Sequence, residues 1–111
     1  WPNRLNLNLK KMSLSNIGQL TFFEPDLNKF PGLRFGWDAI SNPKSSPIVL
    51  NGSNEVAVDC FLKGRINFTD IHYIIEKTLN NYAPIKPKNI GDVIEIDKIT
   101  RIKTLHIIKE I

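Results

Sequence analysis

The spacing of hydrophobic residues changes near position 30 and divides the chain into two parts. Before that point, three leucines in 5–9 alternate with polar residues, and the Leu-Thr-Phe-Phe segment at 20–23 has β character. These patterns predict an extended arm with one short strand over residues 1–26. A lone strand is not stable by itself, so we interpret the arm as the linker from a preceding domain, whose sheet the strand would complete. From Phe30 onward, apolar residues recur every three or four positions, which predicts α-helices.

The first predicted helix covers residues 31–40. Pro31 suits its first turn, and the Asn42-Pro43 pair ends it. The apolar residues of this helix share one face, and they are Phe30, Leu33, Trp37 and Ile40. We therefore expect Trp37, the largest of them, to have a structural role in the packing of the domain.

The second predicted helix is apolar around most of its circumference. Ser46 is its expected N-cap, Pro47 its first residue, and Gly64 lies just past its end. Only one narrow stripe is polar, and it is formed by Gly52, Glu55, Asp59 and Lys63. A helix of this kind is surrounded by other helices, so we expect it to be the central helix of a bundle.

Four further side chains of this helix are expected to have structural roles. Val56 and Cys60 are predicted to lie in the core, where a buried thiol is inert. Asn51 and Asn54 are predicted to lie in the same buried arc, where an amide without a hydrogen bond costs about 1–3 kcal/mol. We interpret both as tethers to the backbone of the arm or of an adjacent loop. The alternative is that they hold a ligand.

A third helix is predicted to begin after Phe68, with Thr69 or Asp70 as its cap. Its apolar stripe is formed by Ile71, Ile74, Ile75, Thr78, Leu79 and Tyr82. The stripe is continuous and faces one side, which is typical of a helix that packs against a neighbour.

The last third of the sequence predicts two more helices. Asn89 is expected to cap a short one and Asp97 a longer one. The β-branched run at 93–97 is also compatible with a strand, but the pattern that follows keeps helical spacing without turn residues. The predicted fold is therefore all-α, a bundle of four to five helices over residues 27–111.

Composition narrows the classes of function. The net charge of +4 comes from scattered basic residues, a pattern that does not indicate nucleic-acid binding. No apolar run is long enough to span a membrane. The single cysteine excludes an internal disulfide and fits a reducing compartment, so we expect a cytoplasmic protein. Trp1 stands where a start methionine is usual, which suggests a piece of a longer polypeptide.

Candidate chemical sites are few, and we expect none to be catalytic, cofactor-binding or metal-binding. His72 and His106 have no further ligand at a spacing that would bring both to one helix face. Glu55 and Asp59 lie four residues apart, but Lys63 follows at the same spacing, so we interpret them as a solvated stripe. The glycines of the first helix do not form a dinucleotide fingerprint.

One set of motifs resembles a known enzyme family. The segments are Trp1-Pro-Asn-Arg4, Leu20-Thr-Phe22 with Pro25-Asp26, Phe30-Pro31, Leu50-Asn-Gly-Ser-Asn-Glu-Val-Ala57 and Phe68-Thr-Asp-Ile71. Their order and spacing resemble those of the 1-deoxy-D-xylulose 5-phosphate reductoisomerases. In that family the segment at 50–55 usually reads Leu-Asn-Ala-Ala-Asn-Glu, so Gly52 and Ser53 replace two alanines. The resemblance covers about the first eighty residues, and from Tyr82 onward only the helical pattern is similar.

The resemblance implies the C-terminal portion of a three-part enzyme. Such enzymes have an NADPH-binding domain, a catalytic domain that uses Mg²⁺ or Mn²⁺, and a C-terminal helical domain. They convert 1-deoxy-D-xylulose 5-phosphate into 2-C-methyl-D-erythritol 4-phosphate for isoprenoid biosynthesis by the non-mevalonate route. The resemblance implies an inactive helical buttress for the upstream catalytic domain, within a full-length enzyme that is a homodimer. The alternative is a free-standing helical module that binds another protein through its arm.

Overall fold

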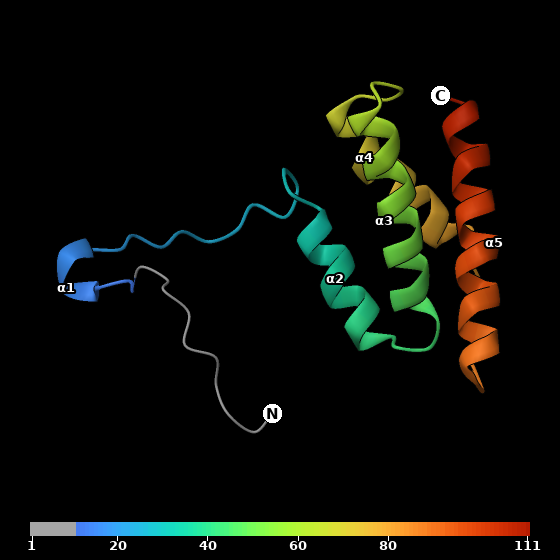
Figure 1. Ribbon diagram of the computed structural model, residues 1–111, viewed down its shortest axis with the longest axis horizontal. Helices are drawn as coiled ribbons and strands as arrows, with labels where there is room; N and C mark the ends of the chain where they lie inside the picture. The colour runs from blue at the N-terminus through green and yellow to red at the C-terminus, as the bar shows by residue number, and fades with distance from the viewer. Residues whose placement is uncertain (1–10) are drawn as a thin grey trace.

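The computed structural model describes residues 11–111. These residues form five helices, shown in Figure 1: α1 (Leu14–Ile17), α2 (Gly32–Ser41), α3 (Ser46–Leu62), α4 (Phe68–Asn80) and α5 (Ile90–Lys109). The leucine alternation at 5–9 and the motif at 1–4 lie outside the described residues. In the described part, the prediction of an all-α bundle is confirmed.

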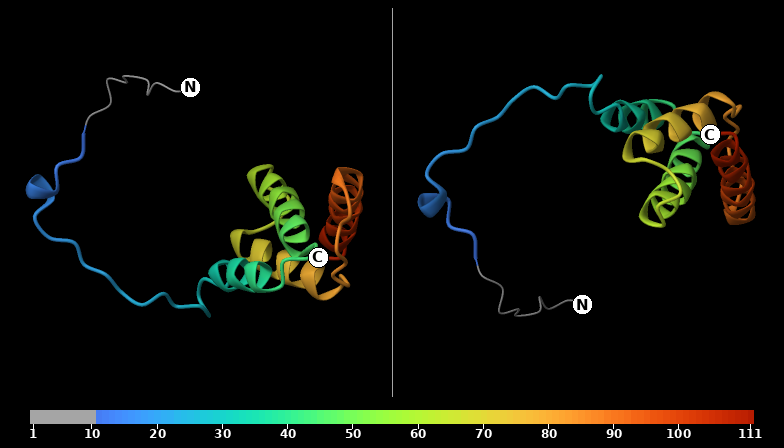
Figure 2. Two further views of the ribbon diagram at one scale, coloured as in Figure 1. Left: turned by 90° about the horizontal axis from the view of Figure 1, so that it is seen from below. Right: turned by 90° about the horizontal axis from the view of Figure 1, so that it is seen from above.

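The arm runs away from the bundle as an extended chain interrupted by the single turn of α1 (Figures 1 and 2). The strand predicted at 20–23 is wrong, because no strand forms between residues 11 and 111. A strand needs a neighbour to satisfy its backbone hydrogen bonds, and the exposed segment around Phe22 and Phe23 has none among residues 11–111. The turn at α1, which follows Ser13, was not predicted.

The core lies where α3 packs against α2, α4 and α5, and α4 also packs against α5. Its buried cluster consists of Phe35, Ala57, Ile71, Ile74, Ile75 and Ile107. Ile74 has no exposed surface. The prediction that the second helix is central is confirmed, since α3 contacts each of the other three long helices.

Local signals place both ends of α3. Pro47 lies in the first turn, and the N-cap is Ser45, one residue earlier than predicted. The Ser45 hydroxyl is buried and accepts a hydrogen bond from the Ile85 backbone N–H at 2.9 Å, which ties the loop before α5 to the start of α3. At the other end Gly64 adopts a φ of 67°, in the left-handed region that favours glycine, and the chain turns there.

Asparagine is the N-cap residue of both α4 and α5. The cap of α4 is Asn67, earlier than the predicted Thr69 or Asp70, and Asp70 instead completes a capping box by accepting from the Asn67 backbone N–H at 2.7 Å. Asn89 caps α5 as predicted, accepting from the Asp92 backbone N–H at 3.0 Å.

A single helix α5 replaces the two helices predicted for the last third, and the alternative strand at 93–97 is also absent. Asp97 does not cap a helix but accepts a hydrogen bond from Arg101 at 2.7 Å, one turn further along. The sequence from Ile90 to Lys109 contains no proline, and its one glycine lies in the first turn. Nothing therefore interrupts the backbone hydrogen bonds along α5.

Candidate functional site

Only some of the residues that were predicted to have structural roles are buried. Cys60 is buried, with 2% of its surface exposed, and Val56 is half-buried. The prediction that Asn51 and Asn54 are buried is wrong, because both are exposed. Trp37 is also exposed and does not join the buried core.

The orientation of α3 explains these differences. Its buried face is formed by Val49, Gly52, Ser53, Ala57 and Cys60, which are mostly small. Small side chains allow neighbouring helices to approach closely on this side. Leu50, Val58 and Phe61, on the adjoining part of α3, are only partly buried against the core. Gly52, predicted to lie in a polar stripe, is buried against α5, where a Cβ would lie 3.0 Å from Asp97 Oδ1 and 3.3 Å from Thr100 Cγ2.

The exposed asparagine and carboxylate of α3 take part in a polar cluster with α5. Arg101 donates from Nη2 to Glu55 Oε2 at 2.6 Å and from Nε to Asp97 Oδ2 at 2.7 Å. Asn51 Nδ2 donates to the other oxygen of Glu55 at 3.1 Å. Arg101 was not singled out from the sequence, although its spacing from Asp97 is typical of a helical ion pair.

Electrostatics in this cluster favour charged side chains. The hydrogen bond from Arg101 lowers the pKa of Glu55, with a smaller contribution from Asn51. The hydrogen bonds to Asp97 and Glu55 raise the pKa of Arg101 further above its ordinary value. Every charge has a partner, and a carboxylate held in its ionised form by an arginine is a poor general base. The cluster therefore joins two helices and is not arranged for catalysis.

This cluster predicts a specific dependence of stability on pH. A carboxylate whose pKa is lowered in the folded state stabilises that state above its unfolded pKa, and the stabilisation is lost as the pH falls through the folded value. We expect Arg101→Gln to reduce the loss of Tm below the ordinary Glu pKa of 4.5, because the largest cause of the lowered Glu55 pKa in the folded state is then removed.

The matched control for this measurement is Lys103→Gln, which removes the same charge from an exposed position on α5. The Tm of the unmodified chain and of the two variants is measured by thermal unfolding across the acidic pH range. If Arg101→Gln and the control variant showed the same pH profile as the unmodified chain, the ionised Glu55–Arg101 pair would have no part in acid stability.

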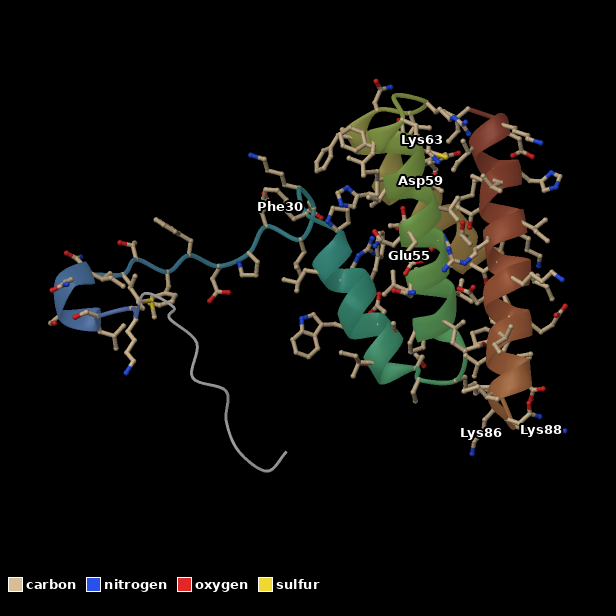
Figure 3. All side chains as sticks on the ribbon, in the orientation of Figure 1. Phe30, Glu55, Asp59, Lys63, Lys86 and Lys88 are labelled. Carbon is tan, nitrogen blue, oxygen red and sulfur yellow. The ribbon has the colours of Figure 1, made fainter. Side chains whose placement is uncertain are left out.

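Along α3, the other two charged residues pair with each other. Asp59 and Lys63 follow Glu55 on the helix in Figure 3, and the Lys63 ammonium lies 2.7 Å from Asp59 Oδ2. Both side chains are more than half exposed. The solvated ion pair fits the sequence interpretation of a solvated stripe.

A cleft of about 530 Å³ lies between α2, the α2–α3 loop and the C-terminal end of α4. Arg34 crosses it and donates from Nη2 to Glu76 Oε1 at 2.9 Å. Asp38 and Lys44 add one further charge of each sign to its lining. A cleft of this size and mixed charge could hold a small polar group, but its lining contains neither histidine nor cysteine.

The two histidines lie away from this cleft. His72 packs edge-on to Phe68, with ring centroids 6.1 Å apart, and touches the start of α2 near Gly32. His106 is exposed on α5. Within residues 11–111, no three His, Cys, Asp or Glu side chains gather closely enough to hold a metal ion. In the same residues, no helix is both long and apolar enough to cross a membrane.

Comparison with known proteins identifies close relatives of this chain. The family model of the DXP reductoisomerase C-terminal domain matches residues 1–103. A 1-deoxy-D-xylulose 5-phosphate reductoisomerase of Prosthecochloris aestuarii is 41% identical over 101 residues, covering 91% of this chain and 26% of that protein. The enzyme of the same name from Ehrlichia ruminantium (strain Gardel) is 43% identical over 103 residues, covering 91% of this chain and 27% of that protein.

A solved structure has a similar fold. It is the 1-deoxy-D-xylulose 5-phosphate reductoisomerase of Zymomonas mobilis in complex with NADPH, and it is 35% identical with a TM-score of 0.85. The match covers 97% of this chain and 29% of that one. This chain thus spans about a quarter of the length of the curated relatives that it matches.

Proposed function

Because this chain belongs to the 1-deoxy-D-xylulose 5-phosphate reductoisomerase family, as its C-terminal domain, we propose that it supports the catalytic part of a longer reductoisomerase polypeptide. The longer protein would rearrange and reduce 1-deoxy-D-xylulose 5-phosphate to 2-C-methyl-D-erythritol 4-phosphate with NADPH. The observation that carries this proposal is the match of almost the whole chain to about a quarter of each relative.

The proposed role is structural because the described residues do not fit either cofactor of such an enzyme. Gly32 and Gly36 lie in α2 without the surroundings of a phosphate-binding loop. The acidic side chains at the α3–α5 interface already pair with Arg101 and are not free to bind a divalent cation. We therefore assign NADPH and the Mg²⁺ or Mn²⁺ ion to the preceding part of the polypeptide.

The proposed domain division is an arm at 1–26, which is the end of the catalytic domain, and a helical domain at 27–111. The buried cluster supports this division, since its first member along the chain is Phe35 and its last is Ile107. The side chains from 14 to 30 are exposed and add nothing to that core. We further propose that the full-length enzyme is a cytoplasmic homodimer. A free-standing interaction module is the weaker candidate, because the relatives are about four times longer.

The proposed function is tested with the polypeptide that carries the sequence upstream of Trp1. We expect this longer protein to form 2-C-methyl-D-erythritol 4-phosphate from 1-deoxy-D-xylulose 5-phosphate and NADPH, and to stop doing so when a chelator removes the divalent metal. Product formation is followed by mass spectrometry. A folded longer protein that bound neither substrate nor NADPH would contradict the proposal.

A further inference from the structure

Helix α2 has two apolar faces, and only one of them is covered in this chain. Phe35 and Ala39 face the bundle and are buried. At 100° per residue, the opposite side of the helix carries a second stripe. This outer stripe consists of Phe30, Leu33, Trp37 and Ile40. Trp37 is 63% exposed and Ile40 is 69% exposed.

The outer stripe continues at the N-terminal end of α2. Phe30 lies where the arm joins the helix, as Figure 3 shows. His72 of α4, whose Nε2 would lie 3.6 Å from a Cβ at Gly32 in α2, packs against Phe68, which is itself exposed. Single exposed apolar residues are normal on a soluble protein, but a continuous apolar stripe over three turns of one helix marks an interface.

A helix that is apolar on opposite sides is typical of one that lies between two layers. Both faces of α2 stay apolar, because the polar residues Arg34 and Asp38 lie at the edge between them, where they line the cleft. The bundle of this chain supplies the inner layer. The outer layer must come from outside the described residues.

We propose that the outer stripe of α2 docks onto an apolar surface of the catalytic domain that precedes this chain, an inference that rests on the proposed function. The arm enters α2 at Phe30, the first residue of the stripe, so the preceding domain is tethered beside this face (Figure 1). A covalent tether gives such a domain an effective concentration at the stripe that a second copy of the chain lacks.

Comparison with a solved relative supports the preceding catalytic domain as the partner of the outer stripe. The structural match covers 97% of this chain, so it includes the arm, and it leaves most of the Zymomonas mobilis chain outside the match. The side chains of the arm at 14–30 are all exposed. An arm and a stripe that both stay exposed within residues 11–111 are explained by one partner that covers both.

Site-specific labelling tests the docking. Ile40→Cys is prepared in the 111-residue chain and in the longer polypeptide, and its alkylation rate is read by peptide mass spectrometry. We expect labelling at position 40 to be at least about tenfold slower in the longer polypeptide, because a docked side chain reacts only when the interface opens. Trp37→Cys is a second probe of the same stripe. Ile102→Cys, half exposed on α5, is the control and should react alike in both proteins.

Equal labelling of Ile40→Cys in the two proteins would overturn the docking. Slow labelling in the 111-residue chain that depends on its concentration would assign the stripe to a second copy and would also overturn it. Product formation is measured with the same longer polypeptide, so that a failure of the docking can be distinguished from a failure of the proposed function. An active enzyme with an unprotected Cys at position 40 rejects the docking alone, and a protected position 40 in an inactive protein rejects the proposed function alone.

Discussion

Replacing Ile74 with alanine is expected to lower the free energy of unfolding of this chain by about 3–4 kcal/mol. Ile74 has no exposed surface and lies among Phe35, Ala57, Ile71 and Ile107, so the substitution removes buried methyl groups and leaves a cavity between three helices. A loss of this size is a large part of the stability of a domain of this length. Urea denaturation followed by far-UV circular dichroism measures it.

Two further variants keep this prediction testable. Ile74→Val removes one methyl group and should cost about 1 kcal/mol, which a folded protein will tolerate even if Ile74→Ala does not fold. Ile94→Ala changes an isoleucine that is largely exposed on α5, and its effect should stay within about 0.5 kcal/mol. Similar losses for Ile74→Ala and Ile94→Ala would show that the core does not lie where α3, α4 and α5 meet.

The second large effect is expected from Gly52→Val, which should cost about 2–3 kcal/mol by overpacking. A Cβ at this position already lies 3.0 Å from Asp97 Oδ1 and 3.3 Å from Thr100 Cγ2, and Thr100 is almost completely buried. The two additional methyl groups would push α3 and α5 apart and displace Asp97 from Arg101. The same urea denaturation measures the loss.

Alanine variants provide the matched comparison. Gly52→Ala requires only a small shift of the Asp97 carboxylate, so its cost should stay below about 1 kcal/mol. Gly36→Ala places a methyl group in α2 where no atom lies within 4 Å. It should raise the stability by about 0.5–1 kcal/mol through helix propensity. A Gly52→Val variant as stable as the unmodified chain would contradict the close approach of α3 and α5.

Helix positions could be predicted from the sequence where the signals are local. Pro47, Gly64 and Asn89 act on the backbone within a few residues of themselves, and each marks a helix end in the structure within one or two positions. Asp97 shows the limit of this reasoning. Its side chain could cap a helix or pair with a residue one turn later, and the presence of Arg101 four positions on favours the pair.

Which face of a helix is buried in this chain could not be predicted from periodicity. The regular stripe of α2 contains Trp37 and was interpreted as the packed face, whereas the structure buries Phe35 and Ala39 on the opposite side. Both faces are apolar, and a sequence pattern does not distinguish a partner in the same bundle from one outside it.

A similar ambiguity affects α3. With apolar residues around most of the helix, the buried side was expected to include Asn51 and Asn54, but the tightest packing occurs at Gly52, Ser53 and Ala57. Small residues allow the closest approach of helices while contributing little to a hydrophobicity pattern. The polar cluster with α5 depends on a contact between Glu55 and Arg101, which lie far apart in the sequence, and no local pattern reveals it.

The central claim is that this chain supports chemistry performed by residues outside it. Its most direct test is an assay of the 111-residue chain beside the longer polypeptide, with NADPH, Mg²⁺ and 1-deoxy-D-xylulose 5-phosphate. We expect substrate-dependent NADPH oxidation by the longer polypeptide only, and no saturable NADPH binding by the 111-residue chain. Turnover or saturable NADPH binding by the 111-residue chain alone would contradict the claim.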